Sequence, residues 1–191
     1  MSKSIRTFIA VKLPETVLAA IDQVQGQLAA HGFKVRWVKT GNIHLTLKFL
    51  GDVPEDELDG IAAVLAEAAH GHAPLRLAAA GVGVFPSIKR ARVIWVGITG
   101  QLPEFAALQR SIADRLAAIG YPHETRPYSG HLTLGRVKGP MAASRLTTAM
   151  GAFRDFASET FEVDRVVLFK SDLRPSGALY TELRQVPLSG R

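Results

Sequence analysis

The 191-residue chain contains no cysteine, and this absence excludes disulfides, thiolate metal sites and cysteine nucleophiles. It has no long apolar stretch either, so we expect neither a signal peptide nor a membrane span. The sequence also lacks a Walker loop, which is typical of P-loop nucleotide hydrolases, and a Gly-x-Ser-x-Gly elbow, which is typical of serine hydrolases. The lack of cysteine fits a reducing compartment, and we expect a cytoplasmic protein.

The composition is that of a folded, basic protein. Hydrophobic residues make up 47% of the chain and charged residues 21%, which is enough to bury a substantial core. The length fits one domain, and we treat residues 1–191 as a single domain of two lobes. The formal net charge of +6 favours polyanionic partners, among which phosphate backbones are the commonest.

One phrase occurs twice in the chain. Residues 44–49 read His-Leu-Thr-Leu-Lys-Phe and residues 131–136 read His-Leu-Thr-Leu-Gly-Arg. The two copies of His-Leu-Thr-Leu begin 87 residues apart (131 − 44), which is close to half of the chain. The repeat indicates a diverged duplication with one motif in each half.

The alternation of side chains along a strand places the histidine and the threonine of this phrase side by side on one face. His44 and Thr46 point to one face of a strand, and the leucines beside them point to the other, towards a hydrophobic layer. The second copy places His131 and Thr133 in the same way. Two half-buried strands with solvated polar faces are the simplest alternative, but solvation does not require the same histidine and threonine twice.

The hydrophobic pattern predicts helices alternating with strands in both halves. We expect helices over residues 14–30, 54–69, 103–119 and 139–153, and strands over residues 5–12, 35–38, 75–85, 92–98, 161–169 and 178–186, besides the two motif strands. Glycines at 81 and 83 predict a bend or bulge in their strand. Each half supplies helices and antiparallel strands, so we expect an α+β fold whose two lobes face each other across a groove.

Two histidines can hold opposite protonation states near neutral pH, because an unperturbed imidazole titrates at about 6.5. One can take a proton from water while the other gives a proton to a leaving oxygen. Threonine hydroxyls beside them can donate hydrogen bonds to phosphate oxygens. A cyclic phosphodiester, whose leaving group is a sugar hydroxyl, needs these groups and little else.

A metal site is a weaker interpretation. Zinc takes three or four ligands, and no acidic residue lies within or beside either motif. Metal assistance of the two histidines stays open as an alternative, but we expect neither a metal nor another cofactor.

The paired motifs resemble those of the two-histidine phosphoesterase superfamily, and the flanking residues are similar to RNA 2′,3′-cyclic phosphodiesterases, also described as 2′-5′ RNA ligases. The similar segments span nearly the whole chain in order and comprise residues 6–14, 42–51, 83–86, 92–97, 126–136, 168–171 and 177–180. One departure is Gly130, where relatives usually carry a proline before the second histidine.

The resemblance implies a bilobal α+β fold in which two antiparallel sheets face a central cleft, with helices outside and a pseudo-twofold duplication. It implies metal-independent opening of RNA 2′,3′-cyclic phosphate ends to 2′-phosphates. In this comparison His44 is the proton donor to the 3′ oxygen and His131 is the proton acceptor from water. The same site can run backwards and join RNA ends with 2′-5′ linkage. We expect a monomer that acts on RNA ends, for which tRNA fragments are one candidate source.

Supporting residues are proposed from their positions. Thr46, Thr133 and Arg126 would bind the substrate phosphate, with an ordinary surface arginine as the alternative for Arg126. Phe85 and Tyr128 could stack on a base, with a core position as the alternative for Phe85. Strict alternation places Lys48 on the face of Thr46, pointing into the groove, although its end position could leave it in solvent. We read the other histidines as surface residues: His31, His70, His72 and His123.

Two further functions stay open at this point. The protein could act on a small cyclic nucleotide in place of RNA. It could also be an RNA-binding module that has lost its chemistry, although a pure binder has no need of two titrating groups.

Overall fold

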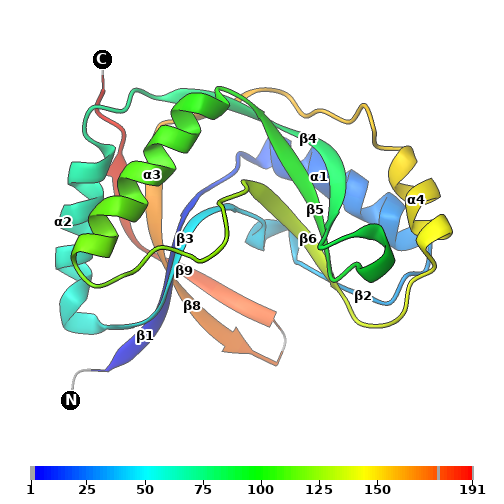
Figure 1. Cartoon of the computed structure of the whole chain (residues 1–191), viewed down its shortest axis with the longest axis horizontal. Coiled ribbons are helices and arrows are strands. Elements are labelled where there is room, and N and C mark those ends of the chain that lie inside the picture. Colours follow the sequence, from blue (N-terminus) through cyan, green and yellow to red (C-terminus); the bar gives the residue numbers. More distant parts are fainter. Residues whose placement is uncertain (1–2, 176, 191) are drawn as a thin grey trace.

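The computed structural model describes residues 3–175 and 177–190, which form two antiparallel sheets (Figure 1). The first sheet has the strand order β3-β1-β8-β9 and comprises β1 (Ser4–Val11), β3 (Leu45–Pro54), β8 (Arg165–Arg174) and β9 (Gly177–Pro187). The second sheet has the order β2-β6-β5-β4-β7 and comprises β2 (Val35–Trp37), β4 (Leu75–Phe85), β5 (Val93–Gly100), β6 (His131–Val137) and β7 (Phe161–Val163). Without the edge strand β2, the two orders correspond strand for strand, as a duplicated fold requires.

Helices cover the outer sides of the sheets. They are α1 (Glu15–Ala30), α2 (Leu58–Ala69), α3 (Leu102–Ala118) and α4 (Ala143–Gly151), with short 3-10 turns η1 (Thr40–Asn42), η2 (Glu55–Glu57) and η3 (Ile88–Arg90). Figure 1 shows α2 and α3 beside the first sheet, and α1 and α4 beside the second. Helix α1 follows β1 of the first sheet yet packs on the second, and α3 follows β5 of the second sheet yet packs on the first. The two lobes are therefore interleaved.

The leucines of the repeated phrase lie in the hydrophobic core, as the alternation predicted. Leu45 and Leu47 of β3 and Leu132 and Leu134 of β6 are all buried. Each fully buried leucine stabilises the fold by roughly 1.5–3 kcal/mol relative to an exposed one. The polar side chains between them are consequently held on the opposite face of each strand. None of the helices within the described residues is both long and apolar enough to cross a membrane.

Two predicted elements differ from the structure. The helix expected over residues 139–153 is the shorter α4, because the N–H of Lys138 donates to the carbonyl of Lys34 and keeps the chain extended beside β2. The strand expected over residues 161–169 divides at Asp164, where the chain passes from β7 in the second sheet to β8 in the first. The bulge expected near Gly81 is confirmed by the register shift of β4 against β5, where Gly81 has a φ of 64°.

Candidate active site

The two motif strands, β3 and β6, are in contact, and a cleft of about 620 Å³ lies between the sheets beside them. His44, Thr46 and Thr133 line this cleft. His131 opens β6 two residues before Thr133 and therefore lies on the same face of that strand. The fold thus brings together the two motifs that lie 87 residues apart in the sequence.

Both histidines are held by the same backbone contact. Nδ1 of His44 lies 2.8 Å from the carbonyl oxygen of Asn42, and Nδ1 of His131 lies 2.8 Å from the carbonyl oxygen of Ser129. A carbonyl oxygen only accepts, so Nδ1 carries the proton and donates in each case. Nε2 is therefore the nitrogen that each ring offers to a substrate, as an acceptor when the ring is neutral and as a donor when it is protonated.

His44 lies just before β3 and is enclosed by aromatic rings. The ring of Phe8 stacks on it at a centroid distance of 4.6 Å, and Tyr180 meets it edge-on at 5.2 Å. Burial lowers the pKa of His44, while its hydrogen bond to the Asn42 carbonyl acts in the opposite direction. The Asn42 side chain in turn donates to the carbonyl of Ala178 in β9, which ties the segment before His44 to the neighbouring hairpin.

His131 has a different aromatic neighbour. Phe85 at the end of β4 meets its ring edge-on at a centroid distance of 5.0 Å, and Trp95 of β5 lies 5.0 Å beyond Phe85. Glycine at position 83 is needed for this arrangement, because a Cβ there would lie 2.1 Å from the Trp95 ring. Phe85 therefore supports a motif histidine from one side, and its partial burial fits the core alternative for this residue.

Both motif strands contain extra residues relative to a neighbouring strand, two in β3 (Leu47 and Leu50) and one in β6 (Leu134). The register of β3 with β1 skips Leu47, and the register of β6 with β5 skips Leu134. Both leucines directly follow the threonine of their motif, so the two bulges are equivalent. A bulge shifts the alternation by one residue. As a result, Phe49 in β3 and Arg136 in β6 line the cleft.

The bulge corrects the prediction for Lys48. We expected this lysine on the cleft face, two residues after Thr46, but it is buried on the other face with a residue exposure of 3%. Its ammonium donates to the carbonyl of Pro122 at 2.7 Å. Burial lowers the pKa of Lys48, and the charge of Glu124 acts in the opposite direction. The prediction that Lys48 points into the cleft is wrong, because a local sequence pattern does not reveal a bulge.

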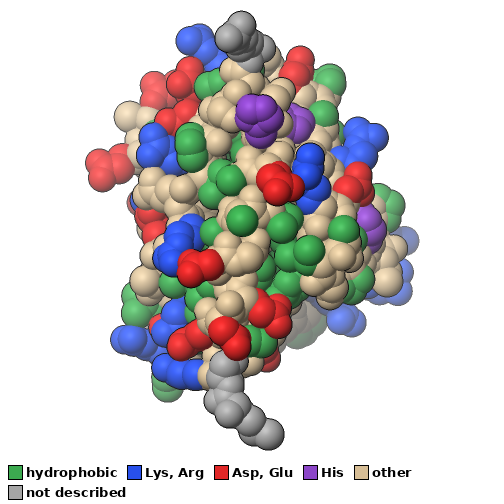
Figure 2. Space-filling model, turned by 90° about the vertical axis from the view of Figure 1, so that its left-hand side faces the viewer, with side chains coloured by type: hydrophobic (Ala, Val, Ile, Leu, Met, Phe, Trp, Pro, Cys, Tyr) green, Lys and Arg blue, Asp and Glu red, His purple; other side chains and the backbone are tan. Residues whose placement is uncertain are grey.

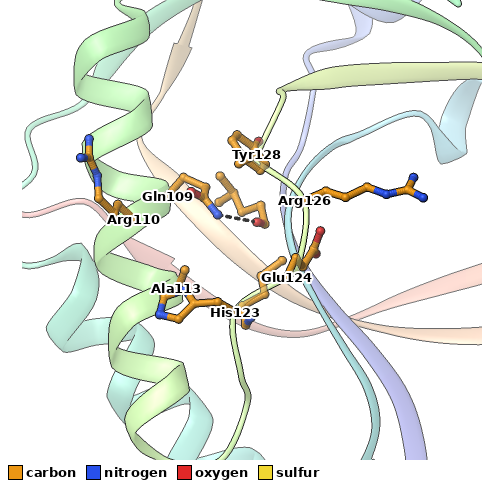
Figure 3. A pocket seen from close by; sticks show the side chains of 9 residues that line it. Gln109, Arg110, Ala113, His123, Glu124, Arg126 and Tyr128 are labelled. Carbon is orange, nitrogen blue, oxygen red and sulfur yellow. Dashed lines mark hydrogen bonds between the residues drawn. The ribbon is translucent and has the colours of Figure 1, made fainter. Parts of the chain in front are cut away.

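Arg126 and Tyr128 line a smaller pocket between α3, β3 and the segment that leads to β6 (Figure 3). The hydroxyl of Tyr128 donates to the carbonyl of Thr46 at 2.8 Å, and burial raises the pKa of this hydroxyl. Tyr128 therefore connects the two motifs. We expected its ring in the cleft as a base-stacking residue, but Tyr128 is not among the residues that line the cleft. In Figure 3 the exposed side chain of Arg126 extends away from α3, and it does not line the cleft either.

The cleft contains cations that the sequence reasoning did not select. Five basic residues and neither aspartate nor glutamate occur among the described residues that line it: Arg6, Arg36, Lys39, Arg136 and Arg174. Arg136 and Arg6 act on the Tyr180 hydroxyl, where their positive charge lowers a pKa that burial raises. The signal for Arg136 was present, because this arginine ends the second copy of the repeated phrase.

The charge of the cleft contrasts with that of the outer helical face. Figure 2 shows acidic and basic side chains interspersed over the side of the molecule that carries α2 and α3. The cleft can therefore attract an anion more strongly than this outer face can. In the described part of the chain, no three histidine, aspartate or glutamate side chains lie close enough together to hold a metal ion.

Comparisons with known proteins agree with this geometry. A family model described as LigT-like phosphoesterase matches twice, over residues 11–95 and 96–180, so that each match holds one motif. An RNA 2′,3′-cyclic phosphodiesterase of Methanothermobacter thermautotrophicus is 36% identical over 94% of this chain and 96% of its own. A protein of the same name from Thermus thermophilus is 34% identical over 97% of this chain and 91% of its own.

Solved structures have the same fold. A crystal structure of a Thermus thermophilus protein superposes with a TM-score of 0.80 and 29% identity, covering 97% of this chain and 99% of that one. Escherichia coli LigT complexed with 3′-AMP superposes with a TM-score of 0.75 at 22% identity, which concerns the fold alone and covers 97% and 98% of the two chains. The double match and the shared bilobal fold have one explanation: the chain belongs to the LigT-like phosphoesterase family.

Proposed function

We propose that the protein hydrolyses 2′,3′-cyclic phosphate ends of RNA to 2′-phosphates by acid–base catalysis with His44 and His131. The observation that carries this proposal is the matched pair of histidines, each with Nδ1 fixed on a backbone carbonyl and Nε2 available, beside a cleft lined with cations. Relatives that match this chain over more than nine tenths of both lengths carry the name RNA 2′,3′-cyclic phosphodiesterase, which supports this choice of substrate.

The reaction needs one proton transfer at each histidine. His131 Nε2 accepts a proton from water while the water oxygen bonds to phosphorus. His44 Nε2–H donates its proton to the 3′ oxygen as the P–O3′ bond breaks, which leaves a 2′-phosphate and a 3′-hydroxyl. The assignment of donor and acceptor rests on the resemblance to the family. A 5′-hydroxyl in place of water would give a 2′-5′ linkage by the same steps.

The lowered pKa of His44 bears on its role as donor. A lower pKa makes the protonated ring a stronger acid, but it reduces the protonated fraction before substrate binds. The negative charge of a bound phosphodiester favours the protonated ring and so opposes the effect of burial. We therefore expect His44 to acquire its proton together with the substrate.

The phosphate would be held by the hydroxyls of Thr46 and Thr133 and by the guanidinium of Arg136. Each hydroxyl can donate to a non-bridging oxygen, and an arginine can donate two parallel hydrogen bonds to the same group. Arg136 takes the role that we first expected of Arg126, because Arg136 lines the cleft with both threonines. The ring of Phe49, which is 55% exposed, offers a surface on which the terminal base can stack.

The remaining cations favour RNA over a small cyclic nucleotide. Besides Arg6 in β1, these are Arg36 in β2, Lys39 before η1 and Arg174 at the end of β8. One cyclic phosphate carries a single negative charge and cannot pair with all of them, whereas an RNA strand supplies a phosphate at every nucleotide. We propose that they bind phosphates upstream of the reacting end, in RNA fragments such as those of tRNA, and that a monomer does so in the cytoplasm.

The test is to incubate the purified protein with an RNA oligonucleotide that ends in a 2′,3′-cyclic phosphate, with and without EDTA, and to identify the product. We expect a 2′-phosphate in both cases and a higher kcat/KM than for 2′,3′-cyclic AMP. Arg174→Ala should reduce kcat/KM for the oligonucleotide and leave kcat/KM for 2′,3′-cyclic AMP unchanged. Binding of the RNA without any product would favour the RNA-binding module, and equal kcat/KM for both substrates would favour a nucleotide enzyme.

A further inference from the structure

Two glutamines contact the two bulges from the helices behind them. In α1, Gln25 Nε2 donates to the carbonyl of Leu134 at 2.9 Å, and in α3, Gln109 Nε2 donates to the carbonyl of Leu47 at 3.3 Å. Figure 3 shows Gln109 reaching from α3 with this bond drawn as a dashed line. Leu134 is the extra residue of β6, and Leu47 is the extra residue of β3 that directly follows the motif threonine. A helix of one half thus contacts the bulge in the motif of the other half.

The contact of Gln25 is the more extensive of the two. Its amide also donates to the carbonyl of Val38 at 2.9 Å, so both N–H groups of the amide have acceptors. The N–H of Val38 donates to the same Leu134 carbonyl at 2.8 Å. Gln25 is buried, with a residue exposure of 9%, whereas Gln109 is only partly buried. A buried amide with two fixed acceptors restricts the backbone at the bulge more than a single, partly buried hydrogen bond would.

The bulges matter because they decide which side chain enters the cleft. If β6 continued past Thr133 with regular alternation and no bulge, Gly135 would lie on the cleft face, and Arg136 would point to the buried side. A Cβ at position 135 would lie 2.5 Å from Val35, so this buried position accepts no ordinary side chain. The presence of Arg136 in the cleft therefore depends on the bulge at Leu134.

We propose that Gln25 and Gln109 are positioning residues for the reaction, each holding the bulge that presents Arg136 or Phe49 to the substrate. This inference rests on the proposed function, in which Arg136 binds the phosphate. Gln25 acts on Arg136 through the Leu134 bulge, and Gln109 acts on Phe49 through the Leu47 bulge. The shorter and more buried contacts of Gln25 predict the larger effect for that residue.

A double-mutant cycle distinguishes positioning from general stabilisation. Gln25→Met keeps the volume of the side chain and removes both donors. In the otherwise unchanged protein it should lower kcat/KM for the cyclic-phosphate oligonucleotide by about 10-fold, the scale of one lost hydrogen bond to a buried group. In the Arg136→Ala background it should lower kcat/KM by less than about 2-fold, because Arg136 is no longer there to be positioned. Gln27→Met, an exposed change two residues further along α1, is the matched control and should leave kcat/KM unchanged.

The same cycle is measured on the affinity for inorganic phosphate by calorimetry, which requires no catalysis. Gln25→Met should weaken phosphate binding by about 10-fold alone and by less than about 2-fold with Arg136→Ala. Equal losses in the two backgrounds would overturn the inference, and so would unchanged phosphate affinity in a folded Gln25→Met variant. An intact cycle on phosphate with no RNA product from the unaltered protein would overturn the proposed function, and would leave only the part of the inference in which Gln25 positions Arg136 towards a bound anion.

The second glutamine keeps the inference testable if Gln25→Met fails to fold. Gln109→Met should lower kcat/KM for the oligonucleotide by about 3-fold, and by less in the Phe49→Ala background, since a longer hydrogen bond contributes less. Its effect on phosphate affinity should be small, because Phe49 has no charge. A loss of phosphate affinity equal to that of Arg136→Ala would contradict the assignment of Gln109 to Phe49.

Discussion

The two His-Leu-Thr-Leu strands share their backbone down to the bulge, yet they present different side chains after it. In β3 the two residues after the bulge are Lys48 and Phe49, and in β6 they are Gly135 and Arg136. The first of each pair is buried and the second lines the cleft. One half therefore offers an aromatic ring to the substrate, and the other half offers a guanidinium at the equivalent position.

The histidines differ in their surroundings as well. His44 stacks on Phe8 and its pKa is lowered by burial, whereas the ring of His131 makes a T-shaped contact with Phe85. The hydrogen bond at Nδ1 is the same in both. The duplicated scaffold holds the two rings by the same backbone contact, and we propose that their different neighbours separate their roles. This is the usual way in which two titrating groups are given different tasks in one site.

Removal of either histidine should have the largest effect. His44→Ala or His131→Ala should each lower kcat by about 10²–10⁴-fold, the usual share of general acid–base catalysis. Both rings act in one step, so the double variant should fall well short of the product of the single effects. Steady-state kinetics on the cyclic-phosphate oligonucleotide measures this, with circular dichroism to confirm folding. A folded His44→Ala variant that keeps most of its kcat would mean that the matched motifs are structural.

The next largest effects should come from Arg136 and Phe49, the cleft-lining residues that follow the two bulges. Arg136→Ala should lower kcat/KM by about 10–100-fold, since a hydrogen bond to a charged group contributes about 1.5–3 kcal/mol. Phe49→Ala should act mainly through KM, because a stacking ring binds ground state and transition state alike. Arg126→Ala is the control outside the cleft, and its effect should stay near 2-fold. If Arg126→Ala costs more than Arg136→Ala, the phosphate is bound elsewhere than we propose.

Much of the fold and several residues of the candidate site could be predicted from the sequence. The α+β class, the two lobes and the long helices follow from periodicity and turn residues, because these features depend on neighbours along the chain. The histidines and threonines followed from the repeat itself. The bulges did not, since register is set by the partner strand and by the glutamines behind it. Lys48 was misplaced and Arg136 was not selected for this one reason, as strict alternation puts each on the wrong face.

The position of Tyr128 was inaccessible for a similar reason. Its hydroxyl meets the carbonyl of Thr46 across a separation of 82 residues in the chain, and the composition around Tyr128 gives no sign of this contact. The passage between sheets at Asp164 is also a tertiary feature, because the residues on both sides of it favour strands equally. Local sequence patterns therefore did not reveal how distant segments pair in the fold.

The smallest effect is the contribution of His44 to the pH dependence of stability. Its pKa is lowered in the native state, while in the unfolded chain it titrates near 6.5. Between those two values the unfolded state binds a proton that the native state does not, so the free energy of unfolding falls as the pH falls through this window. His44→Phe keeps an aromatic ring against Phe8 and cannot titrate. Denaturant unfolding from about pH 8 to about pH 4 should show a shallower decline for this variant, and an identical decline would contradict the lowered pKa.

In the proposed mechanism the two matched histidines each carry out one proton transfer of the same reaction, without a metal. The most direct measurement is kcat/KM against pH in EDTA for the unaltered protein and for the two single alanine variants. The account predicts a bell-shaped profile for the unaltered protein, with limbs that belong to the coupled pair, and the loss of one limb in His44→Ala and of the other in His131→Ala. A profile that keeps both limbs in either variant, or activity that returns only with a divalent metal, would contradict it.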